Sequence, residues 1–456
     1  MPELDLSRPL RIHVVGAGGA GMSAIATVLV AMGHQVSGSD LKDSSALERL
    51  RSLGVDVSVG HDASHLRGAE LVAVSTAVPS RNPEVVAAND IGIPVLRRAE
   101  VLAAITATRR TVAVAGTHGK TTTSSMLALV LVEAGLRPSF IIGGDITEFG
   151  SGAAWGDGEW LVVEADESDG TFLDLDPRIG VVTSVEADHL DHYGSLAAME
   201  AAFAQFLSGA PDARVVCADD PGAARLGRQA QALSYGTSPD ADYRMVELTT
   251  GRGGSRFAVD HAGVRLGEIR LPVPGLHNAR NACGALATAL AIGAPFEAAG
   301  RALGRYGGVA RRFEFRGERD GVTYVDDYAH LPGEVRAALA AGRSADFRRV
   351  VAVFQPHRYS RTASLWQEFG DAFVDADVVL VTDVYGAGEA PRPGVNGRLV
   401  ATAVSDAHPD QEVVYLPDHE GLVEYLRGHL RPGDLCLTLG AGDLTLLPDE
   451  LLDAPA

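Results

Sequence analysis

The chain has 456 residues, enough for about three domains, and its composition (46% hydrophobic, 21% charged) is typical of a globular protein. Its formal net charge of −20 argues against binding to nucleic acid or to an anionic membrane, so anionic ligands need local devices such as helix N-termini. We expect a cytoplasmic protein without membrane insertion or disulfides, because no apolar run approaches roughly 20 residues, no secretory signal is evident and the three cysteines have no paired spacing.

Short β-branched runs alternate with Ala- and Leu-rich stretches, a pattern that predicts an α/β fold built from parallel units. Polar, arginine-containing connections divide the chain into three expected domains at 1–107, 108–308 and 309–456. Between 242 and 274, glycine-rich turns predict antiparallel hairpins, and a helix is expected at 278–292. The expected strands are 11–15, 35–39, 71–75, 94–96, 111–115, 160–164, 179–185, 214–217, 322–325, 349–354, 378–381, 413–416 and 435–439.

The first glycine-rich turn, GAGGAG at 16–21, directly follows an expected strand and precedes an expected helix. Gly16, Gly18 and Gly21 satisfy the pattern G-x-G-x-x-G, and Asp40 ends the next strand about twenty residues later. Such a turn brings backbone N–H groups to a diphosphate at a helix N-terminus. The motif indicates a dinucleotide or a nucleotide-sugar diphosphate, or else a tightly packed turn without a ligand, and it does not specify a reaction.

The run TVAVAGTHGKTTTSSM at 111–126 predicts a strand, a short phosphate-binding turn and a helix. The longer nucleotide-binding loop has a glycine where this chain has Val114, so the loop here is a shorter one. Its backbone N–H groups can surround β- and γ-phosphates, Lys120 can bridge them, and Thr121 lies where a hydroxyl reaches Mg²⁺. His118 either contacts the γ-phosphate or stabilises the turn, and both alternatives stay open.

Two further expected strands end in acidic residues near this loop, at the carboxyl edge of a parallel sheet. Clustered carboxylates repel one another unless a cation lies among them, as a magnesium–nucleotide complex would. Solvated loop carboxylates are the alternative for either cluster alone. The clusters comprise Glu164, Asp166, Glu167 and Asp169, and Glu186, Asp188, His189 and Asp191.

Polar residues also follow elements in the second half of the chain. Asn278 and Asn281 lie near a helix start, where they contact a base or sugar edge, or where Asn278 simply caps the helix. Arg358 and Arg361 are three residues apart and can grip a carboxylate or phosphate from one face. The remaining candidates are Asp326, Asp327, Tyr328, His330 and His357, and the segment 440–443, which is either a backbone anion site or a tight turn.

As a set, these motifs resemble the Mur ligases of bacterial cell-wall synthesis, in the family's order from about residue 11 to 443. The resemblance implies a Rossmann-like N-terminal domain for a UDP substrate, a central P-loop ATPase domain with a mostly parallel sheet plus antiparallel hairpins, and a C-terminal Rossmann-like α/β domain. The chain is most similar to the branch that joins L-alanine to UDP-N-acetylmuramate. The segments that carry the likeness are GAGGAGMS, GTHGKTTT, EADESDGTF, DHLDHYG, GLHNARNA, GVARRFE, DDYAH, QPHRYSRT and DVYGAGE.

The resemblance also implies the chemistry. ATP phosphorylates the lactyl carboxylate of UDP-N-acetylmuramate to an acyl phosphate, the amine of L-alanine attacks it, and phosphate leaves. Two Mg²⁺ ions would neutralise the anionic partners, with Thr121 and Glu164 at one ion and His189 at the second. Lys120 would steady the transferred phosphoryl group, so the implied catalytic set is Lys120, Glu164 and His189. Whether Glu167 rather than Glu164 is the main Mg²⁺ ligand stays open.

The binding residues that the resemblance implies form three groups. Those for ATP are Gly116, Thr117, His118, Gly119, Lys120, Thr121 and Thr122, with Asn278 and Asn281 at the adenine and Asp326 near the ribose. Those for the UDP substrate are Gly16, Ala17, Gly18, Gly19, Ala20, Gly21, Asp40 and Ser75. Those for L-alanine are Tyr328, His330, Arg358 and Arg361, with the arginines on its carboxylate.

The chain departs from the family at Leu331, where the loop D-D-Y-G/A-H-H-P usually has its second histidine. No lysine follows Lys120, so the carbamylated lysine of later-acting ligases is absent, which favours the alanine-adding branch. A recycling ligase that attaches a preformed peptide to the same nucleotide sugar shares most of the motifs. An NAD-dependent dehydrogenase and a non-catalytic nucleotide-regulated protein explain fewer of them. A monomer and a dimer are both compatible with the sequence.

Overall fold

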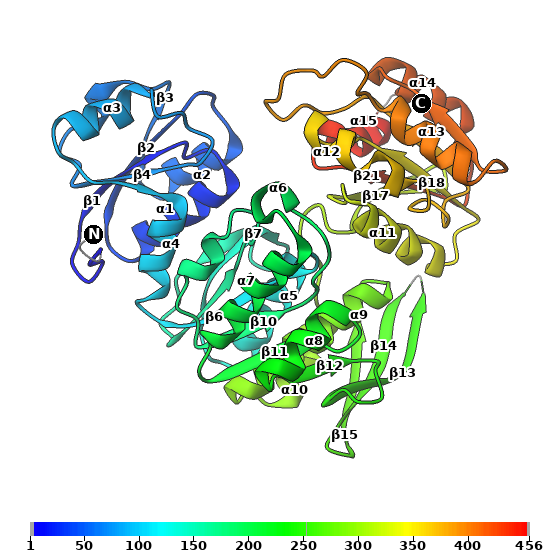
Figure 1. Cartoon of the computed structure of the whole chain (residues 1–456), viewed down its shortest axis with the longest axis horizontal. Coiled ribbons are helices and arrows are strands. Elements are labelled where there is room, and N and C mark those ends of the chain that lie inside the picture. Colours follow the sequence, from blue (N-terminus) through cyan, green and yellow to red (C-terminus); the bar gives the residue numbers. More distant parts are fainter. Residues whose placement is uncertain (1–3, 252, 454–456) are drawn as a thin grey trace. The chain divides into compact units, whose positions relative to one another are not determined.

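The computed structural model describes residues 4–251 and 253–453. The chain forms two compact units. The first extends to Val246 and includes Ala258–Ile269 and Arg280–Tyr306, and the second comprises Glu247–Phe257, Arg270–Ala279 and the chain from Gly307 onward. The described residues contain three sheets with helices packed against them (Figure 1), so the predicted α/β fold is confirmed.

The N-terminal sheet has five parallel strands in the order β3-β2-β1-β4-β5, the order of a Rossmann fold. The strand order reverses between β1 and β4, which is where such sheets bind ligands beyond the carboxyl ends of their strands. The strands are β1 Arg11–Val15, β2 Gln35–Asp40, β3 Asp56–Val59, β4 Leu71–Val74 and β5 Val95–Arg97. The helices are α1 Ala20–Ala31, α2 Ser45–Ser52, η1 Ala63–Leu66, α3 Pro83–Asp90 and α4 Arg98–Thr106.

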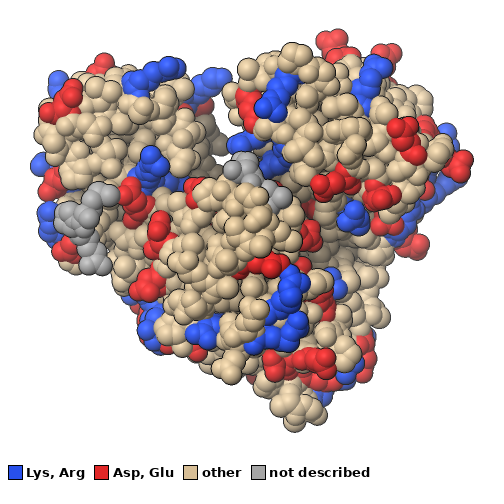
Figure 2. Space-filling view, in the orientation of Figure 1, with Lys and Arg blue, Asp and Glu red and all other residues tan. Residues whose placement is uncertain are grey.

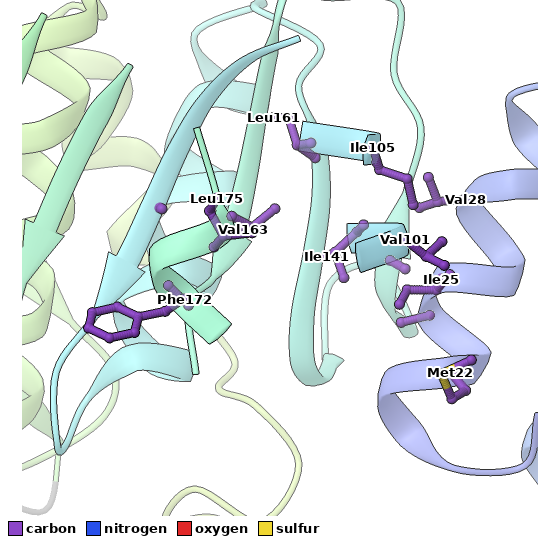
Figure 3. Close-up of a cluster of buried hydrophobic side chains, with 14 of the residues drawn as sticks. Met22, Ile25, Val28, Val101, Ile105, Ile141, Leu161, Val163, Phe172 and Leu175 are labelled. Carbon is purple, nitrogen blue, oxygen red and sulfur yellow. The ribbon is translucent and has the colours of Figure 1, made fainter. Parts of the chain in front are cut away.

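One hydrophobic core within the first unit joins helices of this N-terminal part to the central sheet. Ile25 and Val28 of α1 and Val101 of α4 gather with Ile141 and Leu161 of the central strands (Figure 3). All five side chains are at least nine-tenths buried. The helix that follows the first glycine-rich turn is therefore packed through apolar contacts, which are the dominant favourable term in folding.

The central sheet has ten strands in the order β15-β14-β13-β12-β11-β10-β6-β9-β7-β8. β6 lies between β9 and β10 and is parallel to both, so the phosphate-binding turn and both acidic clusters lie at one edge of the sheet. The strands are β6 Arg110–Ala115, β7 Ser139–Ile146, β8 Ser151–Ala154, β9 Trp160–Glu164, β10 Ile179–Val182, β11 Ala213–Cys217, β12 Leu233–Gly236, β13 Tyr243–Gly251, β14 Gly254–His261 and β15 Val264–Leu271. The helices are α5 Lys120–Glu133, η2 Thr171–Asp174, α6 Leu190–Tyr193, α7 Leu196–Ser208, α8 Pro221–Ala230, α9 Leu276–Ile292 and α10 Phe296–Gly304.

Helix α5 follows the phosphate-binding turn and is buried over most of its length, from Thr121 to Leu131. This burial explains why the helix carries apolar and small hydroxyl side chains and no charge after Lys120 until its last residue. Ser125 Oγ lies 2.8 Å from Tyr306 Oη, so one buried hydroxyl of the helix is satisfied by a side chain rather than by water. The turn that precedes α5 is thus supported by a rigid element.

The sheet of the second unit has six strands in the order β16-β17-β21-β18-β19-β20, and only β16 is antiparallel to its neighbour. The loops after β17 and β18 therefore lie at one edge, separated by β21. The strands are β16 Glu314–Arg319, β17 Val322–Asp327, β18 Arg349–Phe354, β19 Val378–Val381, β20 Glu412–Tyr415 and β21 Asp434–Leu439. The helices are α11 Pro332–Ser344, α12 Tyr359–Leu365, η3 Trp366–Phe369, α13 Arg398–Ala407, α14 His419–His429, η4 Asp443–Leu446 and α15 Leu447–Asp453.

The buried strands agree with the sequence-based expectation, and β1, β9, β18 and β19 have the predicted bounds. The strands β3, β7, β8, β12 and β16 were not predicted. β3 and β16 are edge strands with partly exposed residues, and β7, β8 and β12 contain glycines, so none has more than two consecutive buried β-branched residues. The two-residue turn of Ala262 and Gly263, both with positive φ, joins β14 to β15 as the predicted hairpin.

Charged side chains of both signs are interspersed over the face shown in Figure 2, and they form no single basic field there. None of the helices in the described part of the chain combines the length and the apolar character that crossing a membrane requires.

A buried ion pair joins β18 to β21 in the second unit and yields a test of its stability. Asp434 is fully buried and accepts hydrogen bonds from Arg349 Nε at 3.0 Å, from Arg349 Nη2 at 2.5 Å and from Arg431 N at 2.8 Å. We expect Asp434→Ala to lower the free energy of unfolding by about 3 kcal/mol, because Arg349 then loses its counterion in a partly buried position. Urea denaturation followed by circular dichroism measures this loss.

The matched control is Arg343→Ala, which removes the half-exposed pair between Arg343 and Asp377. An exposed pair contributes little, so we expect this control to lower the free energy of unfolding by less than about 1 kcal/mol. Equal losses in the two variants would contradict the role given to the buried pair.

Candidate active site

The turn between β6 and α5 has a glycine at each end, and neither position has room for a side chain. The φ angles of Gly116 and Gly119 are +133° and +81°. A Cβ at Gly116 would lie 2.2 Å from Thr183 Oγ1, and one at Gly119 would lie 2.5 Å from Asn281 Oδ1. The backbone of the turn therefore approaches its neighbours as closely as only glycine permits.

Val114 occupies the place of the first glycine in the longer phosphate-binding loop. It is a fully buried residue of β6, paired in the sheet with Glu164 of β9 and with Val181 of β10. A buried central strand favours a β-branched residue and is weakened by glycine. The shorter loop predicted from the sequence thus begins two residues later, where the strand ends.

The loop after β10 holds this turn in place. Thr117 N donates to Ser184 O at 3.0 Å, and His118 N donates to Ser184 Oγ at 2.9 Å. Thr183 Oγ1 donates to the carbonyl oxygen of His118, and His118 Nε2 lies 3.2 Å from Glu186 Oε2. Of the two alternatives for His118, stabilisation of the turn is therefore supported, while a contact with the γ-phosphate stays a prediction.

Lys120 is the first residue of α5, and its side chain folds back over the turn. Its Nζ donates to Gly116 O at 2.7 Å and to Glu167 Oε1 at 2.8 Å. Burial opposes the charged form, but Glu167 and Glu164 outweigh it and raise the pKa of Lys120, so the ammonium group is charged at neutral pH. Burial also raises the pKa of Glu167, whose side chain is 1% exposed.

Thr121 and Glu164 form a second pair beside this lysine. Thr121 Oγ1 donates to Glu164 Oε1 at 3.0 Å, and Glu164 Oε2 accepts from Gly143 N at 2.8 Å. A Cβ at residue 143 would lie 2.7 Å from the same carboxylate oxygen, so the close approach requires glycine. A hydroxyl oxygen and a carboxylate oxygen are thus held side by side at the end of the turn, which is a donor set suited to Mg²⁺.

The second acidic cluster is arranged differently. His189 has a φ of +51°, and its Nε2 lies 3.2 Å from Asp188 Oδ2. The side chain of Asp191 lies outside the described residues. Among the side chains that are described, no group of three or more His, Cys, Asp or Glu residues has an arrangement that could hold a metal ion. A second metal site at His189 therefore stays a prediction.

Helix α9 supplies the two asparagines assigned to adenine. Asn281 lies beside Gly119, where its Oδ1 occupies the space that a side chain at residue 119 would need. Asn278 donates from Nδ2 to Pro274 O at 2.8 Å. The helix begins at Leu276, so Asn278 lies in its first turn, and the alternative that Asn278 is the N-cap is wrong. The adenine contacts stay predictions.

The first glycine-rich turn is shaped by strand β2. Gly16 N and Ala17 N both donate to Ser39 O, at 2.8 and 3.0 Å, and Gly18 N donates to Asp40 Oδ2 at 2.8 Å. These three N–H groups are directed at the protein. Asp40, expected at the end of this strand as a ligand contact, therefore has one oxygen occupied by the turn itself.

Helix α1 follows this turn and begins at Ala20, with Gly19 as a cap residue that makes no side-chain hydrogen bond. The first N–H groups of a helix have no partner within the helix and favour an anion. Ser75 approaches the turn from β4, since a Cβ at Gly16 would lie 2.9 Å from Ser75 Cβ. Gly16 and Ser75 thus lie together at the switch point of the sheet, where folds of this class bind their ligands, and a diphosphate there stays a prediction.

In the second unit, the residues assigned to the amino acid form an aromatic and cationic cluster. The rings of Tyr328 and His330 are 5.4 Å apart, and those of His330 and His357 are 5.5 Å apart. Arg361 Nη1 lies 3.1 Å from His357 Nδ1, and Arg358 is exposed with a φ of +68°. Burial and the neighbouring cations lower the pKa of His357 to about 4, so the arginines carry the positive charge here.

Asp326 and Asp327 precede this cluster and are both buried. Asp326 accepts hydrogen bonds from Thr438 Oγ1 and Thr445 Oγ1, each at 2.6 Å, so both of its oxygens have partners within the second unit. Burial raises the pKa of Asp327 to about 6. A ribose contact of Asp326 stays a prediction. Leu331, at the position of the missing histidine, is a buried residue directly before α11.

Comparisons with known proteins agree with this geometry over nearly the whole chain. The sequence matches the families described as "Mur ligase family, catalytic domain" at 11–110, "Mur ligase middle domain" at 114–289 and "Mur ligase, glutamate ligase domain" at 311–442. The chain belongs to the Mur ligase family. The three matches occur in the order that the sequence motifs predicted.

Relatives of this Mur ligase share its length. The UDP-N-acetylmuramate–L-alanine ligase of Solidesulfovibrio magneticus is 48% identical over 95% of this chain and 96% of that protein. The protein of the same name from Acidothermus cellulolyticus is 48% identical over 99% of this chain and 96% of its own length. Among solved structures, the UDP-N-acetylmuramate-alanine ligase MurC of Thermotoga maritima matches with a TM-score of 0.83 and 29% identity, covering 97% of this chain and 98% of that one.

Mg²⁺ and ATP, which the family implies, can be tested against the residues present. Glu167 Oε2 is buried and accepts no hydrogen bond, although the other oxygen of the same carboxylate pairs with Lys120. Such an unpartnered buried oxygen is costly unless a cation or donor reaches it. Together with Thr121 and Glu164 it gives the Mur ligase three hard oxygen donors beside its phosphate turn, so the residues fit a magnesium–nucleotide complex.

Some contacts of the site could not be found from the sequence. Gly143, which holds Glu164, lies in the unpredicted strand β7. Arg98 begins α4, and its Nη2 lies 3.4 Å from Asp166 Oδ2. Its Cδ lies beside the first glycine-rich turn, 3.3 Å from where a Cβ at residue 21 would be. An arginine at a helix start has no distinctive sequence signal, so only the folded Mur ligase reveals that it joins the first glycine-rich turn to the acidic cluster.

The tightest contact of the phosphate turn provides a test. Gly116→Ala would place a methyl group 2.2 Å from Thr183 Oγ1 at a φ of +133°, so the turn must move away from β10. We expect ATP affinity to fall at least about tenfold, because a shift of the backbone N–H groups costs on the order of a few hydrogen bonds. Calorimetric titration with ATP and Mg²⁺ measures the change.

The control is Gly300→Ala in helix α10, where a Cβ would meet no atom within 4 Å. This substitution should leave ATP affinity unaltered and stabilise the helix by about 1 kcal/mol, since alanine is the better helix former. An unchanged affinity in Gly116→Ala would show that the turn does not bind ATP.

Proposed function

We propose that this Mur ligase joins L-alanine to UDP-N-acetylmuramate with ATP, through an acyl phosphate of the lactyl carboxylate, in peptidoglycan biosynthesis. Relatives of the same length, 48% identical, carry this activity in their names. The observation that carries the proposal is the placement of Lys120. Its ammonium group lies between Gly116 O at 2.7 Å and Glu167 Oε1 at 2.8 Å, over the end of a turn shaped for phosphates.

The residues of the turn have separate roles in phosphoryl transfer. When bound, Mg²⁺ with ATP supplies the phosphoryl group and neutralises its charge. The backbone N–H groups of 116–122 orient the β- and γ-phosphates, and Lys120 stabilises negative charge on the oxygens in transfer. Thr121 and Glu164 would hold the metal, and the unpartnered oxygen of Glu167 would be a further donor to it. His189 is assigned to a second metal in the same role.

The remaining residues bind the other reactants. The first N–H groups of α1, at the end of the glycine-rich turn at 16–21, hold the diphosphate of the UDP substrate, and Asp40 and Ser75 are assigned to the same substrate site. Arg358 and Arg361 take the carboxylate of L-alanine, because arginine forms paired hydrogen bonds with a carboxylate. Tyr328 and His330 form the wall of that site. The alanine amine stays nucleophilic only when neutral, and the nearby cations favour its loss of a proton.

The proposal includes the organisation of the chain. We assign the UDP-sugar substrate to 1–107, ATP to 108–308 and the amino acid to 309–456. The domain families matched at 11–110, 114–289 and 311–442 support boundaries near these positions. All substrates are small metabolites of the cytoplasm, so we assign the protein to that compartment, where it contributes to cell-wall growth and hence to cell shape and division.

Phosphate release from ATP tests the reaction. We expect release that requires both UDP-N-acetylmuramate and free L-alanine, and none when the tripeptide of a recycling ligase replaces L-alanine. Mass spectrometry should detect UDP-N-acetylmuramoyl-L-alanine as the product. Turnover with the tripeptide alone would assign the chain to the recycling reaction, and reduction of NAD⁺ would overturn the ligase assignment altogether.

Lys120→Ala tests the phosphate turn as the site of chemistry. We expect turnover to fall by at least about a thousandfold, as when a charged group of phosphoryl transfer is removed, with affinity for UDP-N-acetylmuramate unchanged. Stopped-flow phosphate detection and calorimetry measure the two quantities. Arg301→Ala, which removes an exposed cation from α10, is the control and should keep full activity. Loss of turnover and of nucleotide-sugar binding together would contradict the separate assignment of the two turns.

A further inference from the structure

A buried carboxylate surrounded by histidines lies in the N-terminal part of the first unit, away from the phosphate-binding turn. Glu84 at the start of α3 has a side chain that is 0% exposed. His13 of β1, His61 from the loop between β3 and η1, and His65 of η1 surround it, and their side chains are 1%, 10% and 23% exposed. A buried charge of this kind is costly unless it is fully hydrogen-bonded, so the cluster requires an explanation.

Both carboxylate oxygens of Glu84 accept hydrogen bonds, and each oxygen has its own partners. Oε1 lies 2.7 Å from His65 Nδ1 and 3.5 Å from His13 Nε2, and it accepts from Asp62 N at 3.4 Å. Oε2 lies 2.8 Å from His61 Nδ1 and accepts from Ser39 Oγ at 2.7 Å. Burial would raise the pKa of Glu84, but its histidine and serine partners lower it to about 2, so the group is a carboxylate at neutral pH.

Ser39 joins this cluster to the first glycine-rich turn. Its hydroxyl donates to Glu84, while its carbonyl oxygen accepts both Gly16 N at 2.8 Å and Ala17 N at 3.0 Å. Ser39 is fully buried, and its hydroxyl also lies 3.0 Å from Nδ1 of His61, another member of the same cluster. The position of the Ser39 carbonyl thus determines where the turn lies, and with it the first N–H groups of α1.

We infer that Glu84 is a positioning residue for nucleotide-sugar binding, which acts through Ser39 on the glycine-rich turn at 16–21. The carboxylate never touches the ligand. By accepting the hydrogen bond of the Ser39 hydroxyl, it holds Ser39 in a fixed position between the histidines and the turn. The turn then holds the first N–H groups of α1 in the orientation that binds the diphosphate. The inference rests on the proposed binding of UDP-N-acetylmuramate at this turn.

The substitution Glu84→Gln separates positioning from simple burial. Glutamine has the same shape, but its amide has one acceptor oxygen, so it cannot accept donors on both sides as the carboxylate does. We expect the dissociation constant for UDP-N-acetylmuramate to rise about tenfold, the effect of one misplaced buried hydrogen bond, while the KM for ATP stays the same. Ser39→Ala removes only the hydroxyl and should weaken binding by a similar factor.

The double variant Ser39→Ala/Glu84→Gln tests whether the two residues act along one path. Residues that act through each other are not additive, so the double variant should bind about as weakly as either single variant, rather than about a hundredfold more weakly than the parent. The control is Val85→Ala on the same helix, which loosens apolar packing and removes no polar partner. It should lower the melting temperature and leave the dissociation constant unchanged.

Isothermal calorimetry with UDP-N-acetylmuramate alone, without ATP or L-alanine, measures all five proteins. Unchanged affinity in folded Glu84→Gln and Ser39→Ala would overturn the inference while the proposed function stands. Additive losses in the double variant, or an equal loss in Val85→Ala, would also overturn it, because the effect would then be one of general stability. If the parent chain failed to bind UDP-N-acetylmuramate, the proposed function would fall, and the inference with it.

Discussion

The close contact between Gly116 and the loop after β10 is the constraint on which the rest of the active site depends. Because Gly116 has no Cβ, the carboxyl end of β6 can lie directly against Thr183, in a position that any other residue would be too large to occupy. The turn is then held by Ser184 and by the hydroxyl of Thr183, which donates to the carbonyl oxygen of His118, before α5 begins. The positions of Lys120 and of the rest of the site depend on where the backbone of this turn lies.

The electrostatics of the site follow from the same arrangement. The chain has a net charge of −20, yet its proposed substrates are anions. The protein meets this need locally, with one lysine whose charge is maintained by Glu167 and with backbone N–H groups at helix starts. The acidic residues near the turn do not repel the nucleotide once a divalent cation lies between them, and the unpartnered oxygen of Glu167 leaves a place for one.

The two glycine-rich turns have a similar construction but different proposed roles, binding of the UDP substrate and transfer of a phosphoryl group. Each follows a buried parallel strand and precedes a helix. The first turn is shaped by Ser39 of the adjacent strand, and the phosphate turn by Thr183 in the loop directly after the adjacent strand. They differ in what supports them. The phosphate turn is followed directly by Lys120 and Thr121, a cation and a hydroxyl suited to transfer of a phosphoryl group. The first turn is supported through Ser39 by a buried carboxylate, which is suited to holding a ligand still.

The sequence by itself determined the α/β class, the buried central strands and the identity of both glycine-rich turns, because these depend on local patterns of burial and on backbone geometry that only glycine allows. It also indicated Lys120, Thr121 and the acidic strand ends, since their types and spacing carry the chemistry. Only the tertiary structure decided which partners these residues have. Gly143 on Glu164, Asn281 beside Gly119, Arg98 near Asp166, and the histidines around Glu84 are far apart along the chain. Their contacts arise when the sheets bring distant strand ends together, and no local pattern records that.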